Sequence, residues 1–189
     1  MTSKPEEILT AIESLSTAER ERLFAALASQ YGNILAPRAA QLELGSGFAV
    51  SPPVDKPDYV LVFDGGSQGN PGPGYGSYAL ILGQDGPPAI VRLDFDREMT
   101  NNEAEYESLI AGLENLIARI QRDGLDPADF TVEVRGDSAL VINQVKGTWK
   151  AKEARMRTLR SRARALLSRL AGYTLHTQPR EESVRLLGH

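Results

Sequence analysis

One stretch, residues 59–74 with the sequence YVLVFDGGSQGNPGPG, constrains the fold more than any other part of the chain. Alternate side chains of an extended strand point to opposite sides, and here both sides are apolar until Asp64. The pattern therefore predicts a strand covered on both faces, followed by a glycine-rich loop. Asp64 is then half-buried, and such a carboxylate needs a hydrogen-bond donor, a basic side chain or a cation nearby.

The chain from about residue 58 onward predicts an α/β domain. A turn, GQDGPP, separates two further strand patterns, and a capping box formed by Thr100 and Glu103 opens a helix with one apolar face. After the first strand, the predicted elements are strands at 75–82 and 89–95, that helix, a strand at 130–135, helices at 138–145 and about 152–170, and a strand at 173–177. The order βββαβααβ predicts a mixed sheet with helices on its faces.

Two segments precede this domain. Residues 1–44 carry two capping boxes and apolar residues at helical intervals, which predicts an N-terminal α-hairpin. Residues 45–57 are rich in glycine, serine and proline without periodicity, which predicts a linker. We expect the main domain to span residues 58–189, and the hairpin to contact a protein partner, a second copy or the domain itself.

The composition excludes several kinds of site. The 189 residues include no cysteine, which excludes disulfides, thiolate metal sites and a cysteine nucleophile, and two histidines argue against a histidine-rich zinc site. No apolar run approaches the roughly 18 residues of a membrane span. The acidic N-terminus has no apolar region typical of a signal peptide, so we expect a cytoplasmic protein without membrane contact.

Positive charge is concentrated between Lys146 and Arg169, although the formal net charge of the chain is -4. Glu153 is the single acid in this stretch. We expect the apolar residues of the predicted helix to face inward and its arginines outward. The nearly uniform sign favours contact with phosphates over a merely solvated face. Trp149, just before this helix, either lies against a sugar or fills the core, and we expect it in the core.

Three carboxylates occupy positions that need an explanation. Asp64 ends a buried strand, Glu105 lies on the apolar face of its helix, and Asp137 follows the carboxyl end of a strand, where open α/β sheets place active sites. Each has a structural alternative: a turn cap for Asp64, an interaction with the helix dipole for Glu105 and a helix N-cap for Asp137. One shared cause explains all three positions, so we expect the carboxylates to converge.

Convergence of these carboxylates requires a compensating charge. Two negative charges about 4 Å apart repel by about 4 kcal/mol at an effective dielectric constant of about 20. Divalent cations remove this repulsion, and oxygen ligands without histidine or cysteine select Mg²⁺ or Mn²⁺. Two such ions about 4 Å apart stabilise phosphoryl transfer. We expect the glycines after Asp64 to let a phosphate backbone approach this site.

The stretches FDGGSQGNPGPGYG, TNNEAEYESLIAGLE and GDSALVINQVKGTWK occur in this order, and together they resemble the ribonuclease H family, in the branch without an inserted basic handle. The resemblance covers about residue 58 to the end. It implies a ribonuclease H-like fold with a five-stranded mixed sheet. It also implies two-metal, endonucleolytic hydrolysis of the RNA strand of RNA/DNA hybrids, giving 3'-hydroxyl and 5'-phosphate products. By motif position, Asp64, Glu105 and Asp137 are the catalytic, metal-binding carboxylates.

The same motifs imply four residues that bind the hybrid substrate, several of them near ribose hydroxyls: Asn70, Asn101, Asn102 and Gln144. An amide offers both a donor and an acceptor, which suits the 2'-hydroxyl that separates RNA from DNA. Without the motif, Asn101 and Asn102 would be interpreted as the start of a helix.

The last residues, PREESVRLLGH, depart from the family pattern. Ser183 stands where the family has an asparagine, and Leu187 stands where it has a fourth metal-binding aspartate. The resemblance therefore implies a missing ligand, and we expect a shortened C-terminus without the final helix. Glu182 or His189 could replace the ligand, although the end of a chain tends to fray. The leading hypothesis is a weakened ribonuclease; the alternative is a catalytically impaired module that still binds the hybrid.

Overall fold

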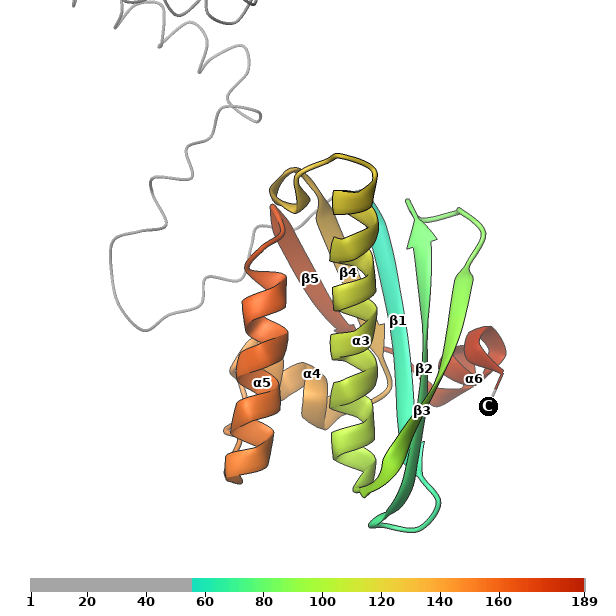
Figure 1. Ribbon diagram of the computed structural model, residues 1–189, viewed down its shortest axis with the longest axis vertical. Coiled ribbons are helices and arrows are strands. Elements are labelled where there is room, and N and C mark those ends of the chain that lie inside the picture. Colours follow the sequence, from blue (N-terminus) through green and yellow to red (C-terminus); the bar gives the residue numbers. More distant parts are fainter. Residues whose placement is uncertain (1–55, 189) are drawn as a thin grey trace, which may run out of the picture. The chain divides into compact units, whose positions relative to one another are not determined.

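The computed structural model describes residues 56–188, and five of their strands form one sheet (Figure 1). The strands are β1 (Tyr59–Ser67), β2 (Gly72–Leu82), β3 (Ala89–Met99), β4 (Thr131–Gly136) and β5 (Gly172–Thr177). Their order across the sheet is β3-β2-β1-β4-β5. The first three strands pair antiparallel, whereas β4 lies parallel to both β1 and β5. The predicted five-stranded mixed sheet is confirmed.

The helices lie on both faces of this sheet, with α3, α4 and α5 on one face and α6 on the other (Figure 1). They are α3 (Asn101–Arg122), α4 (Ala139–Lys146), α5 (Ala154–Leu167) and α6 (Arg180–Leu187), together with a short 3-10 helix, η2 (Pro127–Asp129). No helix within residues 56–188 is long and apolar enough to cross a membrane. The predicted hairpin at 1–44, most of the predicted linker and His189 lie outside the described residues, so those assignments stay predictions.

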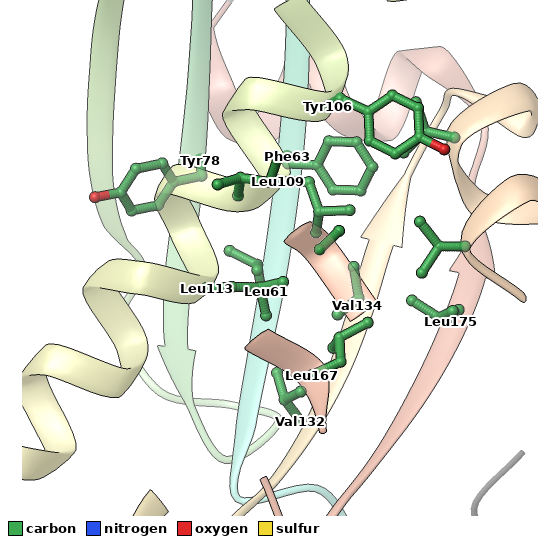
Figure 2. Close-up of a cluster of buried hydrophobic side chains, with 14 of the residues drawn as sticks. Leu61, Phe63, Tyr78, Tyr106, Leu109, Leu113, Val132, Val134, Leu167 and Leu175 are labelled. Atoms are coloured by element: carbon green, nitrogen blue, oxygen red, sulfur yellow. The ribbon is translucent and has the colours of Figure 1, made fainter. Parts of the chain in front are cut away.

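β1 is the central strand, and its alternating side chains divide the core into two clusters. Leu61 and Phe63 are fully buried in the larger cluster, between the sheet and the helices α3 to α5 (Figure 2). Val60 and Val62 point to the opposite face, where they form a smaller cluster with Ala79 of β2 and a residue of α6. The prediction of a strand covered on both faces is therefore confirmed.

α3 follows the sequence prediction closely. The side chain of Thr100 accepts a hydrogen bond from the backbone N–H of Glu103, and the Glu103 carboxylate accepts one from the backbone N–H of Thr100. This reciprocal capping box satisfies amides that have no partner within the helix itself. The apolar stripe packs on β1 and β2 and is fully buried or nearly so: Leu109, Leu113, Leu116, Ile117 and Ile120.

α5 keeps its apolar residues inward as predicted, and two of its exposed arginines pair with acids of α3. The guanidinium of Arg155 lies 2.6 Å from a carboxylate oxygen of Glu103. Arg162 lies 2.8 Å from Glu114 and 3.4 Å from Glu107, so both arginines pair with acids of α3. Arg155 and Arg162 are nevertheless exposed, as predicted. Arg160 and Arg164 are only partly exposed, and Nε of Arg164 donates a 2.8 Å hydrogen bond to the backbone carbonyl of Val145, so the prediction of outward arginines is wrong for these two. The buried residues of α5 are Met156, Leu159, Ala163 and Leu167.

The expectation that the final helix is absent is wrong, because Arg180–Leu187 forms α6. Glu181 and Glu182 lie in its first turn and Arg185 in its last, an arrangement that the helix dipole favours. Gly188, with φ of 84°, ends the helix in the left-handed conformation, which glycine adopts without a steric penalty. These local signals are present in the sequence, and the buried side chain of Leu187 adds the packing that a short helix needs.

Candidate active site

Asp64 and Asp137 lie side by side because of the register of two parallel strands. Phe63 of β1 pairs with Gly136 of β4, and the next residue of each chain is an aspartate. β1 continues beyond this point only as a partner of β2, so its pairing with β4 ends where the two carboxylates begin. Asp64 is 3% exposed, more buried than predicted, and accepts a 2.8 Å hydrogen bond from the backbone N–H of Gly65.

Glu105 reaches the same place because α3 packs closely on Gly65. A Cβ atom added to Gly65 would lie 2.5 Å from the backbone carbonyl of Ala104 and 2.7 Å from the backbone nitrogen of Glu105. Only a residue without a side chain permits this approach. We predicted that the glycines after Asp64 admit a phosphate backbone. At Gly65 the backbone of α3 fills the side on which a Cβ atom would lie, so the missing side chain here serves the packing of α3, and the approach of a phosphate stays a prediction.

Gly65→Ala is expected to lower the free energy of unfolding by about 2 kcal/mol or more, because backbone atoms rather than a flexible side chain stand in the way. Urea denaturation measures this loss. Gly124→Ala is the control, since its Cβ would meet nothing within 4 Å and only its φ of 76° costs energy, about 1 kcal/mol. Equal losses in the two variants would contradict a tight contact at Gly65.

The three carboxylates form one cluster, as predicted. Asp64, Glu105 and Asp137 each offer an oxygen, and these oxygens lie within 4.8 Å of one another. Within residues 56–188 this is the only group of three or more acidic, histidine or cysteine residues with such spacing. The Oε2 atom of Glu105 is buried and accepts no hydrogen bond from the described residues. An all-oxygen donor set with a buried, unsatisfied carboxylate oxygen fits Mg²⁺ or Mn²⁺.

The electrostatics of the cluster also indicate a cation site. Burial and then the negative charges of Asp137 and Asp64 together raise the pKa of Glu105 from its ordinary value of 4.5 to about 8. A hydrogen bond with Ser138 and the positive charge of Arg180 oppose this shift without cancelling it. Without a cation, Glu105 therefore holds its proton at neutral pH, because three carboxylates this close resist simultaneous ionisation.

The raised pKa predicts that the metal-free protein loses stability as the pH rises. The pKa of Glu105 in the folded protein, about 8, exceeds its ordinary value of 4.5, so between these values the folded state binds more protons than the unfolded state. The free energy of unfolding should then fall by up to about 1.4 kcal/mol per pH unit over this interval. Chemical denaturation from pH 5 to pH 8 in a chelator, on the parent and Glu105→Gln, measures the difference. The same pH dependence in both proteins would show that Glu105 is not the group whose raised pKa lowers the stability.

Arg180 is a site residue that the sequence analysis missed. One of its terminal guanidinium nitrogens lies 3.6 Å from Oδ2 of Asp137. Arg180 follows β5, and because β5 runs parallel to β4, its carboxyl end lies at the same edge of the sheet as Asp137. This edge rule applies to any residue just after a parallel strand and could have drawn attention to Arg180.

Two of the predicted substrate-binding amides connect the glycine-rich loop to the start of α3. Oδ1 of Asn101 accepts hydrogen bonds from the backbone N–H and the hydroxyl of Ser67, at 2.9 and 2.8 Å. Oδ1 of Asn70 accepts a 3.2 Å hydrogen bond from the backbone N–H of Asn101. Asn101 and Asn102 are also the first two residues of α3, which agrees with their alternative interpretation as the start of a helix. Asn70, Asn101 and Asn102 are all exposed.

The other predicted amide, Gln144, is 6% exposed and lines an open pocket of about 520 Å³ with Asn102. Trp149 lines the same pocket and is 50% exposed, so the prediction that it fills the core is wrong. Gly147 ends α4 in the left-handed conformation, and the chain then turns so that residues 148–150 are exposed. The remaining lining residues are Leu140, Thr148, Lys150, Lys152, Glu153 and Met156.

The two C-terminal residues that depart from the family pattern, Ser183 and Leu187, are both buried. Leu187 is 1% exposed and lies in the smaller cluster with Val60, Val62 and Ala79. Ser183 is fully buried and accepts a 2.8 Å hydrogen bond from the side chain of Gln178. Glu182 is exposed on α6 and does not belong to the acidic cluster, so it does not replace the missing ligand in this structure.

Comparison with known proteins agrees with this fold and site. Residues 63–184 match the family described as reverse transcriptase-like. Ribonuclease HI of Halobacterium salinarum is 38% identical over 126 residues, which is 65% of this chain. The structure of LC11-RNase H1 in complex with an RNA/DNA hybrid superposes with a TM-score of 0.60 at 32% identity, covering 68% of this chain and 90% of that chain. The chain thus belongs to the ribonuclease HI-like family.

The chain is shorter than the curated relatives that it matches. It spans 57% of the length of the Halobacterium protein. It spans 31% of the Bifunctional protein Rv2228c of Mycobacterium tuberculosis, with which it shares 36% identity over 122 residues.

Proposed function

We propose that the protein is a metal-dependent endonuclease that hydrolyses the RNA strand of RNA/DNA hybrids. The observation that carries this proposal is the convergence of Asp64, Glu105 and Asp137 from β1, α3 and the end of β4 to within 4.8 Å. The relationship to Ribonuclease HI and the likeness to LC11-RNase H1, whose structure contains an RNA/DNA hybrid, support the same substrate.

Asp64, Glu105 and Asp137 would hold two Mg²⁺ or Mn²⁺ ions. When bound, such ions neutralise the developing charge of the phosphoryl group and activate water. The chain's own contribution is to hold three carboxylates rigidly, through the β1–β4 register and the contact of α3 with Gly65. Water attacks the scissile phosphorus and the bond to the 3'-oxygen breaks. The 3'-oxygen gains a proton, which leaves a 3'-hydroxyl and a 5'-phosphate.

The proposed substrate contacts lie near the first turn of α3. Asn70 and Asn101 tie the glycine-rich loop to this turn, and Asn102 faces the pocket that Gln144 and Trp149 line. We assign these amides to ribose hydroxyls and neighbouring groups of the hybrid, because an amide can both donate to and accept from a 2'-hydroxyl.

We also propose that turnover is weaker than in a site with four carboxylates. The support is Leu187, which occupies the position of the fourth acid in the family pattern and is buried among aliphatic side chains. The same observation favours the second candidate function, a module that binds the hybrid but does not cleave it. The two candidates differ in whether Asp64→Asn changes cleavage.

A labelled RNA/DNA hybrid, incubated with the protein and Mg²⁺ or Mn²⁺, tests the proposal. We expect cuts within the RNA strand, products that carry a 5'-phosphate, and no cleavage in chelator or of the equivalent DNA duplex. Binding without cleavage at high protein concentration would favour the binding module. The absence of both binding and cleavage would reject both functions.

A further inference from the structure

Gln144 is a buried amide whose carbonyl oxygen has a fixed partner. Its Oε1 accepts a 2.9 Å hydrogen bond from the hydroxyl of Tyr106, which is fully buried in α3. Gln144 itself is more than nine-tenths buried, and it lines the pocket next to Asn102. Within residues 56–188, no acceptor is found for its Nε2 group. A buried amide with one satisfied end therefore has a donor available toward the pocket.

The chemistry of the two groups determines the direction of this hydrogen bond. An amide oxygen can only accept, and the phenol has one O–H to donate, so the hydroxyl of Tyr106 donates to Oε1 of Gln144. The NH₂ group of Gln144 is then the end of the amide that remains for another acceptor.

We propose that Tyr106 is a positioning residue, which holds the amide of Gln144 so that its NH₂ group donates to an acceptor atom of the bound nucleic acid. This inference rests on the proposed function. Without the tyrosine hydroxyl the amide could rotate by half a turn and present an acceptor instead. Tyr106 adjoins Glu105 in α3, so one helix turn would position both a substrate-binding amide and a carboxylate of the cluster.

The chemistry of the donor defines what it recognises. An NH₂ group donates to an oxygen or nitrogen acceptor. The minor groove of a hybrid duplex presents two kinds of acceptor: the 2'-oxygen of ribose, and the base atoms N3 of purines and O2 of pyrimidines. Both interactions would be formed in the ground state. Their loss should raise KM more than it lowers kcat.

A double-mutant cycle tests the inference. We expect Tyr106→Phe to raise the KM for hybrid about fivefold with little change in kcat, the size expected for one lost hydrogen bond. Gln144→Leu should raise KM at least as much, and adding Tyr106→Phe to it should raise KM no further. A fivefold effect that persists in the Gln144→Leu background would overturn the inference, as would a wild-type KM in Tyr106→Phe.

Tyr78→Phe is the matched control, because Tyr78 is also a buried tyrosine but belongs to β2, outside the pocket. It should leave KM unchanged. The side-chain amide signals of Gln144 in ¹H–¹⁵N NMR spectra provide a readout independent of cleavage, and they should shift in Tyr106→Phe but not in Tyr78→Phe. Unshifted signals in Tyr106→Phe would also overturn the inference.

Modified substrates separate the two acceptors. Hybrids with single 2'-deoxy substitutions in the RNA strand remove a ribose acceptor, and hybrids with single 3-deazapurines remove a base acceptor. We expect one of these series to raise the KM of the parent but not of Gln144→Leu. If neither does so, Gln144 does not donate to the hybrid. If the parent itself cleaves no hybrid, the proposed function fails, whereas the NMR comparison still decides whether Tyr106 fixes the amide.

Discussion

Asp137→Asn is expected to reduce metal-dependent hybrid cleavage by about a hundred- to a thousandfold, the size seen when a group that stabilises charge in a transition state is removed. The side chain keeps its shape but loses the charge that a divalent cation requires. Single-turnover cleavage of a labelled hybrid in Mg²⁺ measures the loss, and isothermal titration calorimetry should show weaker Mg²⁺ binding.

The same substitution should make the metal-free protein more stable at neutral pH. Asp137 raises the pKa of Glu105 through like-charge repulsion. Removing its charge reduces the repulsion among the carboxylates, which raises the free energy of unfolding. Glu182→Gln is the control, because this acid of α6 is exposed and lies outside the cluster. Unchanged cleavage in Asp137→Asn, or an equal loss in Glu182→Gln, would contradict the assignment of the site.

Leu187→Asp is expected to lower the free energy of unfolding of the metal-free protein by about 3 kcal/mol or more. The substitution loses the packing of a side chain that is 1% exposed and places a carboxylate among Val60, Val62 and Ala79. Urea denaturation in chelator measures the loss. A stability equal to that of the parent would show that Leu187 is not part of the core.

Leu187→Asn separates lost packing from buried charge, since it has nearly the same shape as Leu187→Asp without the carboxylate. With Mg²⁺ present, we expect Leu187→Asp to recover more stability than Leu187→Asn, because Leu187 packs on the face of β1 that also carries Asp64. Equal recovery would mean that an acid at this position does not reach the bound ions.

Much of the fold follows from short-range patterns. The alternation in β1 predicted two apolar faces, and Leu61 and Val62 indeed lie in different clusters. Thr100 and Glu103 predicted the start of α3 because a capping box involves residues only three positions apart. The approach of Asp64 and Asp137 was predictable as well, since the carboxyl ends of parallel strands meet at one edge of a sheet, whereas Glu105 was included because it lies on the apolar face of its helix.

Other features depend on contacts between distant parts of the chain. The hydroxyl of Tyr106 bonds to Gln144, 38 residues away, and Arg155 pairs with Glu103, 52 residues away. Trp149 was expected in the core from its size alone, but the turn after Gly147 leaves it exposed. α6 was predicted to be absent because the motif of the family is incomplete, although the local signals of a helix are present.

Side-chain periodicity, capping and strand ends were enough to predict the strands, the main helices and the identity of the three acids. The close approach of α3 to Gly65 and the core position of Leu187 could not be predicted in this way. Both depend on the space that other elements of the folded chain leave, and a local pattern does not contain this information.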